Sequence, residues 1–210
     1  MSVMDMINML ARWGHVLFGI TWIGLLYYFN FIQGGYFKKA TPEALADAKK
    51  HLAPEALWWF RWGAMFTLIT GLLLMVGVHK LNVLNDYIVL GATLGTLMFL
   101  NVWLIIWPNQ KIALGMVEGD APAAAGKALL ASRTNTLFSG PMAFFMLAGP
   151  HYAGYGMGVG STALYIALAI TVLLELNALV GKQGPMTTVK GVITSSIILT
   201  AIFVGLFFAV

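Results

Sequence analysis

The sequence contains no cysteine and few charged residues. Without cysteine the chain has no disulfide, no thiolate nucleophile, no Cys-ligated zinc or iron–sulfur cluster, and no covalently attached c-type haem. It has 12 Lys or Arg and 8 Asp or Glu among 210 residues, a charged share of 10%, where soluble domains carry roughly a quarter. So little charge cannot cover a water-facing surface, which excludes an ordinary soluble domain, a disordered chain and a collagen-like chain.

Apolar residues are abundant instead. They make up 60% of the chain, and the mean hydropathy is +0.83. The net charge of +4 does not indicate a nucleic-acid partner, because excess Lys and Arg in a membrane protein mark cytoplasmic loops. We expect the lipid bilayer to be the outer solvent.

Six stretches are long and apolar enough for a membrane-spanning helix, which needs roughly 20 residues. The fourth is the shortest and contains Pro141. The sequence therefore predicts an all-α integral membrane bundle of about six transmembrane helices, a single domain over residues 1–210. The six stretches cover about 13–32, 56–78, 87–107, 134–149, 162–180 and 189–210.

Six spans place both termini on one side, with the loops at 79–86 and 150–161. The other side holds loops at about 33–55, 108–133 and 181–188. Basic residues gather on this second side, which predicts that it is cytoplasmic and that both termini are periplasmic, in a bacterial inner membrane. The first side has Arg12 and Lys80, and the second has Lys38, Lys39, Lys49, Lys50, Arg61, Lys111, Lys127, Arg133, Lys182 and Lys190.

Two cytoplasmic segments carry their own helix signals. Residues 40–55 predict a short helix, with Thr41 as its cap, Pro42 at its first position and Pro54 as its stop. Residues 116–130 are rich in alanine and predict a linker followed by a short helix.

Three histidines lie near the outer ends of predicted helices. His15 is in the first, His79 ends the second and His151 ends the fourth. His15, Gly19 and Trp22 follow i, i+4, i+7 spacing and share one helix face. A glycine one turn from a histidine leaves room for a flat macrocycle, and two histidines on neighbouring helices suit the axial positions of b-type haem, which needs no cysteine.

Two other interpretations of the histidines stay open. Each histidine can be an interfacial anchor or a hydrogen-bonded core residue. Copper, which binds imidazole and thioether groups, is a further alternative. The 12 methionines are scattered without an MxM run, so copper is less favoured than haem.

Glu175 is the one carboxylate deep inside a predicted span, with Asn177 close by and Asn101 in the third span as candidate partners. A charge at this depth is costly, so this polar group is either a proton relay or a helix–helix hydrogen bond. Gly91 and Gly95 form a GxxxG face that suits close packing of helices, within one chain or in a homo-oligomer. We expect a homo-oligomer.

Four segments also carry a family resemblance: RWGHVLFGITWIG (Arg12–Gly24), WWFRWGAMFTLITG (Trp58–Gly71), NVWLIIWPNQK (Asn101–Lys111) and TNTLFSGPMAFFMLAGPHY (Thr134–Tyr152). In this order they resemble helices of the N-terminal domain of the bacterial membrane urate hydroxylases (PuuD-type). The resemblance implies an integral membrane oxidoreductase domain that passes electrons to a c-type cytochrome. It also implies that His15 and His151 are the first ligand pair for haem b, with His79 as the substitute.

The sequence departs from this family in three places. It ends after the sixth span without cysteine, so we expect a stand-alone form lacking the cytochrome c domain. The segment Ile32–Lys39 contains Gln33 and no histidine, and no histidine occurs at Thr134–Asn135. These departures argue against urate hydroxylation itself.

Three functions remain in competition. The first is haem-based electron transfer near the periplasmic face, to a periplasmic cytochrome c or a quinone, with or without oxidation of a small molecule. The second is a non-enzymatic subunit or assembly factor of a respiratory complex. The third is a small proton-coupled transporter with Glu175 in its path.

Overall fold

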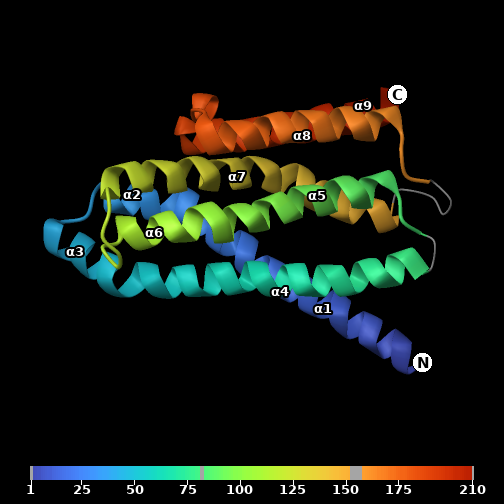
Figure 1. Ribbon diagram of the computed structural model, residues 1–210, viewed down its shortest axis with the longest axis horizontal. Helices are drawn as coiled ribbons and strands as arrows, with labels where there is room; N and C mark the ends of the chain where they lie inside the picture. The colour runs from blue at the N-terminus through green and yellow to red at the C-terminus, as the bar shows by residue number, and fades with distance from the viewer. Residues whose placement is uncertain (1, 81–82, 152–157, 210) are drawn as a thin grey trace.

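The structure is a computed structural model that describes residues 2–80, 83–151 and 158–209. Within these ranges all regular structure is helical, and the long helices run side by side along one axis (Figure 1). The all-helical class predicted from hydropathy is confirmed.

The first part of the chain makes two long helical runs, each interrupted by a π-helical segment. The first run is α1, η1 and α2, and the second is α3, η2 and α4. Their bounds are α1 Val3–Tyr27, η1 Tyr28–Gln33, α2 Gly34–Phe37, α3 Pro42–Asp47, η2 Ala48–Leu52 and α4 Ala53–Lys80.

The rest of the chain makes four more long runs. The first of these again contains a π-helical segment, η3, and a short 3₁₀ helix, η4, joins the last two. The bounds are α5 Asp86–Leu100, η3 Asn101–Ile106, α6 Trp107–Ala113, α7 Ala121–His151, α8 Thr162–Val180, η4 Gly184–Thr187 and α9 Val189–Ala209.

Both termini lie at the same end of the bundle, here called the termini end (Figure 1). The start of α5, the end of α7 and the start of α8 lie there too, while α2, α3, α6 and the start of α7 form the opposite end. Half of the loop predicted at 150–161, residues 152–157, lies outside the described residues. The helices and connecting segments at the opposite end carry most of the basic side chains: Lys38, Lys39, Lys49, Lys50, Lys111, Lys127, Lys182 and Lys190.

Large apolar side chains cover the outside of the bundle, as a lipid solvent requires. Ile20, Leu73 and Leu173 are 66%, 59% and 66% exposed. In the described part of the chain, five helical runs are long and apolar enough to cross a membrane. The chain is therefore a membrane-embedded helical protein. The five runs are Val3–Phe37, Pro42–His79, Asp86–Ala113, Thr162–Val180 and Val189–Ala209.

The fourth predicted span differs most from the structure. In place of 134–149 the chain forms α7, 31 residues long, which continues through Pro141. It is not among the five apolar runs, because it lies inside the bundle with its neighbours packed around it. Buried polar residues such as Thr134, Asn135 and Ser139 lower its hydropathy without exposing it to lipid.

The segments predicted to be cytoplasmic are also more helical than predicted. Thr41 accepts a hydrogen bond from the Ala44 backbone N–H at 3.3 Å and Pro42 begins α3, which confirms the predicted start. The predicted stop at Pro54 is wrong, because the π-helical η2 leads directly into α4 and Pro54 falls in its first turn, where a proline is tolerated. The short helix predicted within 116–130 is instead the first part of the continuous α7.

Glycines set how closely the helices approach. A Cβ on Gly63 of α4 would lie 3.2 Å from the Trp22 backbone nitrogen of α1, and one on Gly91 of α5 would lie 3.0 Å from the Met146 backbone nitrogen of α7. Gly95, one turn along, faces Met142 of α7 at 3.8 Å. The GxxxG face thus packs within the chain.

Candidate functional site

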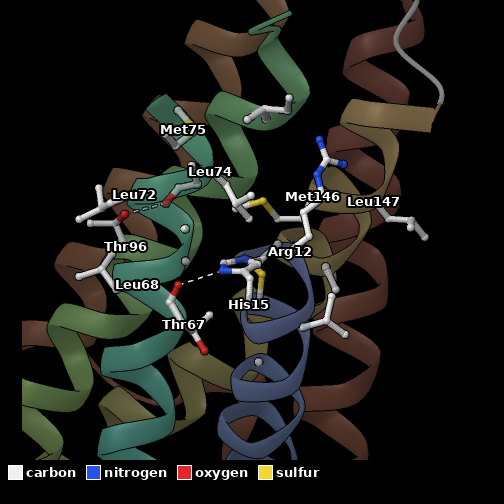
Figure 2. A pocket seen from close by; sticks show the side chains of 18 of the residues that line it. Arg12, His15, Thr67, Leu68, Leu72, Leu74, Met75, Thr96, Met146 and Leu147 are labelled. Atoms are coloured by element: carbon white, nitrogen blue, oxygen red, sulfur yellow. Dashed lines mark hydrogen bonds between the residues drawn. The ribbon is translucent and has the colours of Figure 1, made fainter. Parts of the chain in front are cut away.

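A cavity of about 450 Å³ lies between α1, α4, α5 and α7 in the half of the bundle near the termini end (Figure 2). His15, Gly19 and Trp22 all line it, so the helix face singled out from their spacing faces this cavity. Apart from His15, Arg12 and two threonines, the walls consist mostly of aliphatic, methionine and glycine residues. The arrangement offers a large apolar space with one imidazole in its wall.

His15 is held by the backbone of α4. Its Nδ1 lies 2.9 Å from the Thr67 carbonyl oxygen and 3.2 Å from the Thr70 hydroxyl (Figure 2). Since a carbonyl only accepts, Nδ1 carries the ring proton and donates it there. The other ring nitrogen, Nε2, then keeps its lone pair. In metal-ligating histidines one ring nitrogen binds the metal, and the other typically donates a hydrogen bond that fixes the tautomer and the ring orientation.

Glycines make the room around this imidazole. A Cβ on Gly71 would lie 3.1 Å from His15 Cε1, so the ring packs directly on the bare backbone of α4. A Cβ on Gly19 would meet nothing within 4 Å, which leaves open space one turn from His15. The predicted role of Gly19 as a space-giving residue agrees with this geometry.

Two polar side chains of α1 flank the imidazole. Arg12, one turn before His15, is exposed and lines the cavity, so its guanidinium lies at the open edge. Trp22, two turns after His15, is 3% exposed, and its indole N–H has no hydrogen-bond partner in the described part of the chain. The cation at the edge is available to a bound molecule, whereas the Trp22 indole nitrogen is buried.

Three methionines line the same cavity: Met75 of α4 and Met142 and Met146 of α7. Figure 2 shows the Met146 side chain reaching from α7 toward the space above His15. No sequence pattern indicates this convergence, because these methionines come from helices far apart in the chain and form no motif. The same holds for Thr67 and Gly71, which support His15 from α4.

The other two outer histidines do not share this cavity. His151 ends α7 and lines a separate pocket of about 270 Å³, together with Phe144, Ala148 and Val204. His79 is exposed near the end of α4 and lines neither space. Among the described residues, no three His, Cys, Asp or Glu side chains are grouped closely enough to hold a metal ion.

The polar group around Glu175 lies elsewhere in the bundle. The Asn101 amide of η3 donates to Glu175 Oε2 of α8 at 3.1 Å and to Asn135 Oδ1 of α7 at 2.9 Å. Asn135 in turn donates to the Met98 carbonyl at 2.9 Å. Asn177, the other candidate partner, instead bonds the backbone of Lys182 at the end of α8. This Asn101–Asn135–Glu175 cluster links three helices.

The family model described as Urate oxidase N-terminal matches residues 79–206, more than half of the chain. The chain belongs to this family. No curated protein and no solved structure matches it. As a Urate oxidase N-terminal member with long apolar helices, it is a membrane protein related to the urate hydroxylases, in agreement with the resemblance found in its sequence.

The matched range divides the candidate residues of this Urate oxidase N-terminal protein. It includes His151, Asn101 and Glu175 and runs from the end of α4 into α9. It leaves out α1 and most of α4, and with them His15 and the Thr67 carbonyl. The cavity is therefore built from both parts of the chain, matched α5 and α7 on one side and α1 and α4 on the other.

Proposed function

We propose that this protein is a membrane redox protein that binds a b-type haem in the cavity at His15 and transfers electrons near the periplasmic face. The observation that carries the proposal is the state of His15. Its Nδ1 is occupied by the Thr67 carbonyl at 2.9 Å, and its Nε2 is left as a basic nitrogen in the wall of a large apolar cavity.

The residues around His15 suit a haem in three ways. The walls are apolar, as a porphyrin ring requires. Gly19 leaves open space one turn from His15 for a flat ring, and Gly71 lets the imidazole pack on the backbone of α4. Arg12 supplies a guanidinium at the open edge, where it would pair with a haem propionate.

In this role each residue has a defined task. His15 would hold the iron, and the Thr67 carbonyl would fix the imidazole orientation. The bound group would supply one-electron chemistry at its iron, with a potential set by its axial ligands and by the dryness of the site. The aliphatic side chains of α1, α4 and α7 would exclude water.

The placement of charge supports an orientation for this chemistry. Basic side chains concentrate at the opposite end, which we assign to the cytoplasm, so the termini end and the cavity near it would face the periplasm of a bacterial inner membrane. A haem at this depth would exchange electrons with a periplasmic cytochrome c or with a quinone from the bilayer.

Absorbance spectra test the proposal. The protein is expressed with haem supplementation, purified, and recorded oxidised and dithionite-reduced. We expect a b-type spectrum in the wild type, and its loss in His15→Ala. The matched control is His51→Ala, because His51 is exposed in η2 at the opposite end and contacts only Asp47, at 3.9 Å. A featureless wild-type spectrum, or a His15→Ala protein that keeps its haem, would overturn the proposal.

A further inference from the structure

The cavity brings together soft donor atoms that no sequence motif connects. His15 enters from α1, and the thioethers of Met142 and Met146 enter from α7, on a different wall. Because these two methionines are four residues apart on one helix, they share a face. Imidazole with thioether is a known axial pair of haem iron.

Close packing of α7 on α5 directs both thioethers. A Cβ on Gly91 would lie 3.1 Å from Met146 Cγ, and one on Gly95 would lie 3.8 Å from Met142 Cγ. The two methionine stems therefore run over the bare glycine face of α5. Any larger residue at Gly91 would push the Met146 stem aside.

The histidines at the termini end are placed less well for the same task. His151 is exposed and lines the separate pocket near Phe144 and Val204. His79 is exposed near the end of α4. Neither lines the cavity that His15 enters.

We propose that a methionine thioether of α7, from Met142 or Met146, is the second axial ligand in the His15 cavity. This inference rests on the proposed function, because it assigns a ligand to the haem placed there. It replaces the pairing of His15 with His151 by a His–Met pair. A thioether ligand stabilises the reduced iron, so the site would have a higher potential than a bis-histidine haem.

The test uses the whole protein with its haem bound. A thioether bound to ferric haem gives a characteristic weak charge-transfer band in the red, which imidazole ligands do not give. We expect this band in the wild type, and its loss in either Met142→Leu or Met146→Leu, with a lower midpoint potential. Met75→Leu tests the third methionine of the cavity, on α4, and should keep the band. Met116→Leu is the control and should keep both the band and the potential, since Met116 is 45% exposed and lines neither of the two cavities described.

A second substitution protects the test against misfolding. If Met142→Leu or Met146→Leu loses its haem altogether, substitution of that methionine by histidine should instead restore a six-coordinate spectrum without the thioether band. The inference is overturned if the band is absent from a haem-loaded wild type, survives both leucine variants, or is lost in Met75→Leu or His151→Ala. A wild type without haem overturns the proposed function as well, so the two failures are distinguishable.

Discussion

Two regions of the bundle hold polar side chains among apolar ones, and they differ in what those side chains have left to bind. In the His15 cavity an imidazole held by the Thr67 carbonyl lines about 450 Å³ of space. In the Asn101–Asn135–Glu175 cluster the side chains bond one another, only Asn101 Oδ1 among the described residues of the cluster is buried without a partner, and neither of the two cavities described above reaches them. Polarity inside a membrane protein indicates binding only where there is also room.

The contrast assigns different tasks to the two regions. The cluster joins η3, α7 and α8 by hydrogen bonds of 2.9 and 3.1 Å, which favours helix–helix attachment over a proton path. The cavity, by contrast, contains the His15 imidazole, held by the Thr67 carbonyl, with unfilled space beside it. Four substitutions test this division, two in each region.

The largest effect is expected from Asn101→Leu. Asn101 is 1% exposed, and its loss leaves Glu175 and Asn135 Oδ1 without their donor. We expect a loss of about 1–3 kcal/mol in the free energy of unfolding, measured by denaturation in detergent. Asn109→Leu is the control, since Asn109 bonds only the Ile105 carbonyl of its own helical run. Equal stability of the two variants would remove the structural role of the cluster.

Gly71→Ala should come next, and it acts on the cavity. The new Cβ would lie 3.1 Å from His15 Cε1, so the ring must move by a few tenths of an ångström, which strains its bond to Thr67. We expect haem affinity to fall about tenfold, as for other losses of ligand support, measured by titrating the apoprotein with haem. Gly24→Ala has nothing within 4 Å of its new Cβ and should bind as the wild type does. Unchanged affinity in Gly71→Ala would separate this glycine from the function of His15.

Thr70→Val should have a smaller effect on the same cavity. It removes the weaker of the two His15 partners, at 3.2 Å, and leaves the Thr67 carbonyl in place. We expect haem affinity to fall about threefold, the size of one neutral hydrogen bond. Thr93→Val removes a comparable i−4 hydroxyl bond on α5 without touching His15. A tenfold or larger loss in Thr70→Val would mean that the hydroxyl, and not the carbonyl, orients the ring.

Glu175→Gln should change least. The glutamine keeps an oxygen that accepts from Asn101, so stability should stay within about 0.5 kcal/mol of the wild type. The haem spectrum and the proton permeability of proteoliposomes should not change, as in the exposed control Glu118→Gln. If proton flux is present in the wild type and collapses in Glu175→Gln alone, the cluster is a proton path after all.

The sequence predicted the helices from their long apolar stretches, which a lipid environment requires. Stretches such as 162–180 and 189–210 are mostly apolar, and they match α8 and α9 closely. At α7 the rule found only the part from 134 to 149, because a helix surrounded by other helices need not be apolar to remain in the bundle. The stop predicted at Pro54 was also wrong, because the π-helical η2 leads directly into α4 and Pro54 lies in the first turn of that helix.

The candidate site was predictable only along one helix. The i, i+4, i+7 spacing of His15, Gly19 and Trp22 placed them on one helix face, since helical geometry alone determines it, and this face lines the cavity. What lies opposite that face depends on how α4 and α7 pack against it. Gly71, Met142 and the separation of His151 from His15 arise from this packing, and no spacing within one helix encodes them.

The π-helical segments have a consequence for how this chain can vary. A π turn takes up one extra residue without ending the helix, and that residue rotates everything beyond it by about 100°. In the run from α5 to α6, η3 begins at Asn101, beyond the glycine face that meets α7. Insertion or deletion of a single residue within η3 would therefore rotate the part of this run that lies toward the opposite end, while leaving the wall of the His15 cavity in register. The amino-acid sequences of the two halves of the bundle can therefore change independently of each other.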